Sequence, residues 1–207
     1  MAIAETVLHD FAALVGPAHV ITDQAQLDNN SRDCYWYSPV LKPQLDGKIG
    51  EVIVRPGTVD ELIGVIKVAF RAAVPITMRG AATGNYGQSV PLQGGLVINT
   101  KRLDRIVNLT SDAIQVETGA LLINMEKAAR KIGAELRFYP STLMSATAGG
   151  FLAGVDLAGV AAVQQLEEVV LRLRVLAEVA DQAGGEFGVL DSHVFLAAFA
   201  QRAAVEA

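Results

Sequence analysis

The chain has 207 residues, of which 51% are apolar and 19% charged, a balance typical of folded globular proteins that excludes wholesale disorder. With 17 Lys and Arg against 22 Asp and Glu the net charge is −5, and no basic run occurs, so neither nucleic acid nor an anionic membrane is expected as a partner. The single cysteine, Cys34, excludes an internal disulfide and a cysteine-rich zinc or iron–sulfur site, and the three histidines show no metal-ligand spacing.

Residues 1–48 form a lead-in segment. It begins with the pattern of a short amphipathic helix, whose apolar positions are Val7, Leu8, Phe11, Leu14 and Val15. No basic leader precedes an apolar core, and no run of about 18 uncharged apolar residues is present, so we expect no signal peptide, no membrane span and a cytoplasmic location. We interpret Tyr35, Trp36 and Tyr37 as packing residues, although one of them could instead approach a bound ligand, and Cys34 as a small buried residue.

The next segment carries clear local signals. Ile49–Val54 predicts a buried strand that ends at Pro56-Gly57. Thr58-Val-Asp-Glu61 is a capping box, in which the Thr58 hydroxyl accepts from the amide three residues on and Glu61 reaches back. The helix that follows is expected to end before Pro75 and to bury a face of apolar residues: Leu62, Ile63, Ile66, Ala69, Phe70 and Ala73.

Strands and one more helix follow in alternation. Ile76–Met78 and Leu96–Asn99 predict short strands, and Ile106–Leu109 with Ile114–Glu117 predict a hairpin turned at Ser111-Asp112. Leu121–Ile132 predicts a helix that Gly133 ends in a left-handed conformation. This mixture indicates an α+β or α/β fold.

One loop is rich in small and polar residues and follows the strand Ile76–Met78. Such a loop lets backbone amides converge on an anion, because few side chains hold a ligand away. A long surface turn is the alternative. Arg79 either adds charge or holds the loop from behind, and Thr83, Asn85 and Ser89 can add side-chain donors. The loop comprises Arg79, Gly80, Ala81, Ala82, Thr83, Gly84, Asn85, Tyr86, Gly87, Gln88 and Ser89.

Two common nucleotide-binding motifs do not fit this loop. It lacks the Gly-Lys-Ser/Thr ending of a Walker A loop. Its glycines do not have GxGxxG spacing, and no helix pattern begins after them, which disfavours a dinucleotide-binding Rossmann turn.

A second small-residue segment lies between residues 139 and 154. Its Gly149-Gly150 pair permits close backbone approach, and its hydroxyls offer donors, although a tightly packed helix start is the alternative. Two such segments suggest two walls of one extended ligand site. The candidate residues here are Pro140, Ser141, Thr142, Ser145, Ala146, Thr147, Gly149 and Gly150.

The order of these motifs resembles the PCMH-type FAD-binding domain of the FAD-linked oxidases, the vanillyl-alcohol oxidase superfamily. The nearest branch is similar to the glycolate oxidase subunit and D-lactate dehydrogenase. The resemblance covers roughly residues 49–154 and rests on the order of its parts. These are Arg55-Pro-Gly-Thr58, Pro75–Gly84, Gly94–Asn99, Leu103–Ile106, Val116–Ala120 and Tyr139–Gly150.

The resemblance implies an α+β fold of two α/β subdomains with FAD between them. The loop Arg79–Ser89 would hold the pyrophosphate, Gly119 would sit beside the cofactor at a strand end, and the second segment would line the pyrophosphate, ribityl and flavin side. Some members attach FAD covalently through a histidine in the first loop or a cysteine in the second. Thr83 stands at the histidine position and the second loop has no cysteine, so we expect FAD to bind non-covalently.

The resemblance ends near Gly154. We expect residues 155–207 to form a helical tail unrelated to the family pattern, with helices over residues 160–183 and Ser192–Ala204. Its apolar stripes are compatible with covering a sheet, with homo-oligomerisation or with a partner subunit, and a native tail, a fusion and an out-of-frame ending stay open. The incomplete FAD domain would span residues 49–154.

The sequence supports three hypotheses about function. The first is a flavoenzyme that oxidises a small hydroxy acid, such as glycolate or D-lactate, once a substrate domain is supplied. The second is a truncated flavin-binding module without catalysis, and the third is a phosphate-ligand protein without flavin. No constellation of a base or charged clamp is visible, so we nominate no catalytic residue and no metal ligand.

Overall fold

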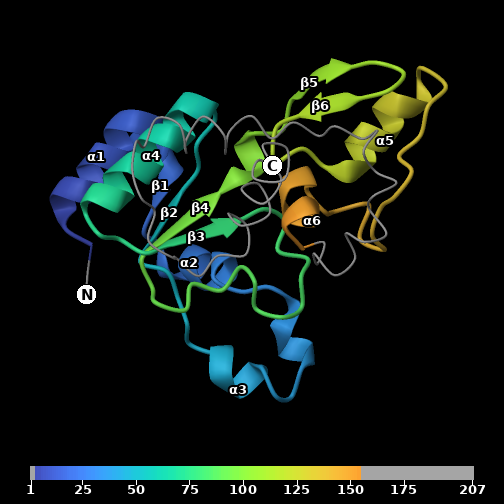
Figure 1. The fold of residues 1–207 in the computed structure, drawn as a ribbon. Helices are drawn as coiled ribbons and strands as arrows, with labels where there is room; N and C mark the ends of the chain where they lie inside the picture. The colour runs from blue at the N-terminus through green and yellow to red at the C-terminus, as the bar shows by residue number, and fades with distance from the viewer. Residues whose placement is uncertain (1–2, 155–207) are drawn as a thin grey trace, which may run out of the picture.

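A four-stranded sheet forms the centre of the first subdomain in the computed structural model, which describes residues 3–154 (Figure 1). β4 pairs in parallel with β2 and β3, while β1 is antiparallel to β2, so the order is β1-β2-β4-β3. The predicted strand over Ile49–Val54 is present but begins at Val52. The strands are β1 (Val20–Ile21), β2 (Val52–Val54), β3 (Ile76–Arg79) and β4 (Leu96–Asn99).

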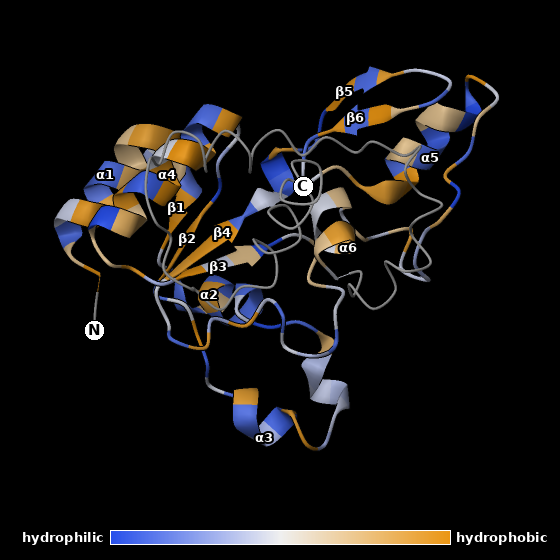
Figure 2. Ribbon diagram, in the orientation of Figure 1, coloured by the Kyte–Doolittle hydropathy of each residue, from blue (hydrophilic) through white to orange (hydrophobic). Residues whose placement is uncertain are grey.

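Helices cover both faces of this sheet. Because side chains alternate along a strand, Val54 and Ile98 pack on α1 (Glu5–Val15) and α4 (Val59–Arg71), while Ile53 and Val97 pack on the side of α2 (Gln24–Asn30). Figure 2 shows the central strands β2 and β4 as largely hydrophobic, as expected for strands that are buried on both faces. The sheet is therefore a rigid base for the loops at its ends.

The capped helix α4 forms largely as predicted. The Glu61 amide donates to the Thr58 hydroxyl at 3.1 Å, but the Glu61 carboxylate accepts from the Gly57 amide at 2.7 Å, one residue earlier than in a standard capping box. The expected apolar face was wrong at its end, because Phe70 is 62% exposed and Ala73 lies beyond the helix with φ 50°. Each residue rotates a helix by about 100°, which turns Phe70 away from the buried face. That face consists of Leu62, Ile63, Val65, Val68 and Ala69.

The second subdomain is a β-hairpin with two helices. β5 (Ile106–Leu109) and β6 (Ile114–Val116) pair antiparallel, which confirms the predicted hairpin. α5 (Leu122–Arg130) lies within the predicted helix, and Gly133 adopts φ 76° after it, as expected. With α6 (Ala148–Gly154), these elements bury a separate core that comprises Ile114, Val116, Ala120, Leu122, Met125, Ala146 and Ala148.

Short helical turns complete the fold: η1 (Pro17–His19), η2 (Cys34–Tyr37), α3 (Lys42–Leu45) and η3 (Thr100–Arg102). In Figure 1 the segment with η2 and α3 projects below the sheet. The mixed α+β class with two subdomains is thus confirmed. The predicted helical tail, residues 155–207, lies outside the described residues.

Candidate functional site

The first small-residue loop leaves the sheet at the carboxyl end of β3. In open sheets with parallel strands, ligands bind at this end of the strands. Arg79 is the last residue of β3, and its carbonyl accepts from the Thr100 hydroxyl at 3.3 Å, which ties the root of the loop to the end of β4. The sequence-predicted loop therefore lies where a ligand site is expected.

The loop has a defined conformation after this root. Ala82 adopts φ 53°, the left-handed conformation, and Gly87 adopts φ 83°. The Gln88 side chain accepts from the Tyr86 amide at 3.1 Å, and the Val90 amide donates to the Gly87 carbonyl at 3.1 Å. The second half of the loop is thus closed on itself.

The first half has unused donors. Within residues 3–154, the backbone amides of the five successive residues from Ala81 to Asn85 donate no hydrogen bond to another residue. These residues are partly or fully exposed, so a ligand can reach them. Consecutive free amides with one residue in the left-handed conformation are the kind of backbone that binds anions.

The second small-residue segment meets this loop at Thr147. A Cβ on Gly80 would overlap the Thr147 Oγ1 atom, so the two segments touch. Thr147 is 1% exposed, and its Oγ1 accepts from the Gly150 amide at 3.3 Å. The two candidate walls therefore join at the boundary between the subdomains.

Gly119 and Gly149 fill tight positions beside this contact. The Gly119 amide donates to the Leu103 carbonyl at 2.7 Å, and a Cβ there would overlap the Thr100 carbonyl oxygen. The Gly149 amide donates to the Thr118 carbonyl at 2.8 Å, and a Cβ there would overlap the Thr118 side chain. The helix-start interpretation thus holds, since α6 begins at Ala148 and packs on residues 118–120.

The remaining predicted residues of the second segment form a turn. The Thr142 carbonyl accepts from the Ser145 and Ala146 amides at 2.9 and 2.8 Å. Ser141 and Ser145 are exposed, while Pro140 and Thr142 are half-buried and Ala146 is buried in the core of the second subdomain. Among the described hydrogen bonds, none joins residues 140–145 to the loop Arg79–Ser89.

The N-terminal segment contributes to the site, which the sequence interpretation missed. The Cys34 amide donates to the Gly84 carbonyl at 2.8 Å, and Arg79 Nη1 donates to the Arg32 carbonyl at 2.6 Å. Asn99 Nδ2 at the end of β4 donates to the Asn30 side chain at 2.9 Å. Residues 30–34 therefore lie across the carboxyl ends of β3 and β4. Only the capping-type residue Asp33 before Cys34 signals an ordered turn in the sequence.

The Arg79 side chain ties the root of the loop to residue 32, which is compatible with the supporting role considered for it. Burial lowers the pKa of its guanidinium below the ordinary value, and the nearby Asp33 and Cys34 partly offset this effect. Asp33 is 5% exposed and accepts from the Tyr35 amide at 2.9 Å through Oδ1. Its other oxygen, Oδ2, has no hydrogen-bond partner, and neither has the Oγ atom of buried Ser89 at the end of the loop.

Two expectations for residues 34–37 were wrong. Cys34 is half-buried rather than buried. Tyr35 is buried as expected, but Trp36 and Tyr37 are 50% and 70% exposed and stack on each other with ring centroids 3.8 Å apart. Stacking gives these two rings a partner without burial in the core.

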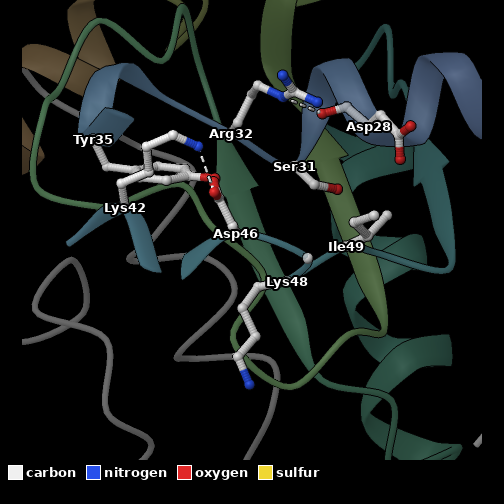
Figure 3. A pocket seen from close by; sticks show the side chains of 9 residues that line it. Asp28, Ser31, Arg32, Tyr35, Lys42, Asp46, Lys48 and Ile49 are labelled. Carbon is white, nitrogen blue, oxygen red and sulfur yellow. Dashed lines mark hydrogen bonds and ion pairs between the residues drawn. The ribbon is translucent and has the colours of Figure 1, made fainter. Parts of the chain in front are cut away.

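A polar cavity of about 290 Å³ lies between η2, α3 and α2 (Figure 3). In it the Tyr35 hydroxyl donates to Asp46 at 2.9 Å, and Lys42 forms an ion pair with the same carboxylate. Hydrogen bonds from Lys42 and Tyr35 lower the pKa of Asp46 below its ordinary value. None of the loop residues 79–89 lines this cavity, so the network supports the segment carrying Asp33.

The described residues show no group of three or more His, Cys, Asp or Glu side chains placed to hold a metal ion. No helix in the same part of the chain is long and apolar enough to cross a membrane.

Three relatives align with parts of this chain. An uncharacterized FAD-linked oxidoreductase of Mycobacterium tuberculosis is 28% identical over 156 residues, which are 74% of this chain and 32% of the relative. A D-lactate dehydrogenase of Archaeoglobus fulgidus is 29% identical over 103 residues, 49% of this chain and 23% of the relative. The glycolate oxidase subunit GlcD of Bacillus subtilis is 24% identical over 132 residues, which are 63% of this chain and 28% of the relative. The chain thus spans a third or less of the length of these relatives.

Solved structures share the fold. Alkyldihydroxyacetonephosphate synthase aligns with a TM-score of 0.66 and 17% identity, over 74% of this chain and 32% of that one. p-Cresol methylhydroxylase aligns with a TM-score of 0.53 and 19% identity, over 63% of this chain and 25% of that one. The FAD binding domain family matches residues 50–181, more than half of the chain and past residue 154, where the motif resemblance ends. The chain therefore belongs to the FAD-binding domain family of PCMH-type fold found in FAD-linked oxidoreductases, and FAD is its cofactor.

Proposed function

We propose that this domain binds FAD non-covalently and that the loop Arg79–Ser89 holds the pyrophosphate through its backbone. The observation that carries the proposal is the row of five amides, from Ala81 to Asn85, that have no partner within residues 3–154. A pyrophosphate offers several acceptor oxygens, and backbone amides donate to them at short range without a side chain in between. The residues present therefore fit the group.

The second wall of the proposed site comes from the other subdomain. Thr147 and Gly149 lie against Gly80 and Thr118, so a cofactor on the loop would also meet residues 147–150. Gly119 keeps the end of β6 close to η3 at the same place. Pro140, Ser141, Thr142, Ser145 and Ala146 are proposed for the flavin side, as the resemblance implies.

Thr83 and Cys34 both bear on how FAD would be attached. Thr83 occupies the position where some family members have an attaching histidine, and its hydroxyl cannot take that role. Cys34 contacts the loop at Gly84 through its backbone amide, and it lies outside the second loop, where other members have an attaching cysteine.

Because neither attaching residue is in place, we expect acid precipitation of the reconstituted protein to release all flavin into the supernatant. Flavin retained in the pellet would contradict non-covalent binding.

The proposed reaction is oxidation of a small 2-hydroxy acid, completed by a substrate domain or a partner chain. Support comes from the names of two relatives, a D-lactate dehydrogenase and a glycolate oxidase subunit. Bound FAD accepts two electrons in such oxidations. The residues of this chain would bind and orient the cofactor, and the base that removes the substrate proton would come from elsewhere.

The first experiment is reconstitution of the purified chain with excess FAD, followed by desalting and a visible spectrum. Retained flavin bands support the proposal, and their absence refutes it. Anaerobic bleaching by glycolate or D-lactate would support the enzyme, whereas retained flavin without bleaching would favour a binding module that needs a second component.

A loop variant sharpens this test. A Cβ on Gly84 would meet only the Oε1 end of the exposed Gln88 side chain, which can move away at the cost of its hydrogen bond from the Tyr86 amide. We expect Gly84→Ile to leave the apo melting temperature within about 2 °C of wild type and to weaken FAD binding by more than about 10-fold, since the side chain stands over the amides. Ala13→Ile, on the exposed side of α1, is the matched control and should bind FAD normally. Equal affinities of the two variants would contradict the loop assignment.

A further inference from the structure

Two buried oxygens without a partner lie at the candidate site. Asp33 Oδ2 and Ser89 Oγ are the buried side-chain polar atoms without a hydrogen bond among the residues that the structure describes. Asp33 is 5% exposed and Ser89 is 8% exposed. Buried polar groups are nearly always paired, so such atoms call for a partner that the described residues do not provide.

Both atoms belong to segments that bound the loop. Ser89 is its last residue, and Asp33 lies between Arg32, which accepts from Arg79, and Cys34, which donates to Gly84. The unpaired oxygens are therefore found where the FAD pyrophosphate is proposed to bind, and not in the polar cavity of Figure 3.

The structural duty of Asp33 uses only one of its oxygens. Oδ1 caps η2 by accepting from the Tyr35 amide at 2.9 Å, and Oδ2 is left over. A capping role alone is served equally well by Asn or Ser, which have one acceptor. The second oxygen of a buried carboxylate thus needs its own explanation.

Charge balance makes a carboxylate tolerable beside a site for an anion. The Arg79 guanidinium lies close enough for its charge to interact with that of Asp33, and Arg79 is half-buried. A carboxylate accepts hydrogen bonds but donates none, so its partner on a ligand has to be a donor. FAD carries such donors on both sides of its pyrophosphate, in the ribityl and the ribose hydroxyls.

We propose that Asp33 is a cofactor-binding residue whose Oδ2 accepts a hydrogen bond from a hydroxyl group of bound FAD. This inference rests on the proposed function, since it requires FAD on the loop. It adds the N-terminal segment to the site and assigns it recognition of a sugar-alcohol hydroxyl, beside the phosphate recognition by the loop.

The test compares Asp33→Asn and Asp33→Ser with wild type in titrations with FAD. Both substitutions keep an oxygen to cap η2, so apo melting temperatures should stay close to wild type. In Asp33→Asn an NH₂ group replaces Oδ2, and in Asp33→Ser the second oxygen is gone. We expect FAD binding to weaken by about 10-fold or more, as for loss of a hydrogen bond to a charged group.

Asp23→Asn is the matched control. Asp23 caps α2 by accepting from the Gln26 amide at 3.0 Å, and it is exposed with no hydrogen bond to the loop among the described residues. This variant should bind FAD as wild type does. Isothermal titrations with FMN and with ADP identify the hydroxyl, because a loss confined to FMN indicates the ribityl chain and a loss confined to ADP indicates the ribose.

The outcomes separate the two proposals. Wild-type protein that binds no FAD refutes the proposed function itself. If wild type binds FAD and both Asp33→Asn and Asp33→Ser bind it with the same affinity as wild type, only the role of Asp33 is overturned. A loss of affinity in Asp23→Asn as large as in the Asp33 variants would also overturn it, since capping would then explain both.

Discussion

The contact between Gly80 and Thr147 joins the two subdomains, and a double-mutant cycle can measure it. Gly80→Ala places a Cβ that overlaps the buried Thr147 Oγ1 atom. Thr147 is 1% exposed, so its side chain has little room to rotate, and rotation would break the bond from the Gly150 amide. Overpacking of this kind costs about 1–3 kcal/mol of the free energy of unfolding.

Thr147→Ala removes the overlapping atom. The nearest atom left to a Cβ at residue 80 is then the Cβ of residue 147, at 3.4 Å, an ordinary contact. The single change itself costs about 1–2 kcal/mol, because it removes one hydrogen bond and one buried methyl group. The double variant should therefore be more stable than the sum of the two losses predicts, by at least about 1 kcal/mol.

Urea unfolding of the apo proteins at 25 °C measures these free energies. Thr147→Ser provides the control, because it keeps Oγ1 and should leave the cost of Gly80→Ala nearly unchanged. If the loss of unfolding free energy in the Gly80→Ala/Thr147→Ala protein equals the sum of the two single losses within about 0.5 kcal/mol, the contact is refuted. In that case the two small-residue segments would not form adjoining walls of one site.

Two further predictions concern stability. Thr58→Ala should lower the free energy of unfolding by about 1 kcal/mol in urea titrations, because the Glu61 amide loses its acceptor, whereas Thr58→Ser should be close to wild type. The pKa of buried Glu126 lies below its ordinary value, mainly because its carboxylate accepts from the Leu136 amide; burial opposes this effect, and Arg130 adds to it. The charged carboxylate therefore stabilises the fold above the ordinary carboxyl pKa, and this stabilisation is lost as the pH falls through the folded-state pKa. The stability gap between wild type and Glu126→Gln should therefore be wide at pH 7 and shrink in acid, and a gap that grows in acid would contradict this sign.

Local sequence signals predicted the elements well, and they were weaker for contacts between distant segments. Helix α4 and the hairpin follow from patterns that span a few residues, such as the Thr58 cap and the turn at Ser111-Asp112. Phe70 was misplaced because apolar spacing alone does not fix which residue ends the buried face. The proposed role of Asp33 could not be predicted from the sequence. It depends on the hydrogen bond between Cys34 and Gly84, which are 50 residues apart and meet only in the tertiary structure.

The glycines of the candidate site divide into two kinds, and this division decides which substitutions report on the ligand. At Gly80, Gly119 and Gly149 a Cβ would overlap buried or backbone atoms of the protein, so packing between the subdomains already explains why they are small. At Gly84 a Cβ would meet only the movable end of Gln88. Packing therefore gives only a weak reason for the small size of Gly84, while the proposed approach of an anion to the amides from Ala81 to Asn85 would account for it. Substitutions of the first kind should lower stability together with FAD affinity, whereas substitution at Gly84 should lower affinity alone.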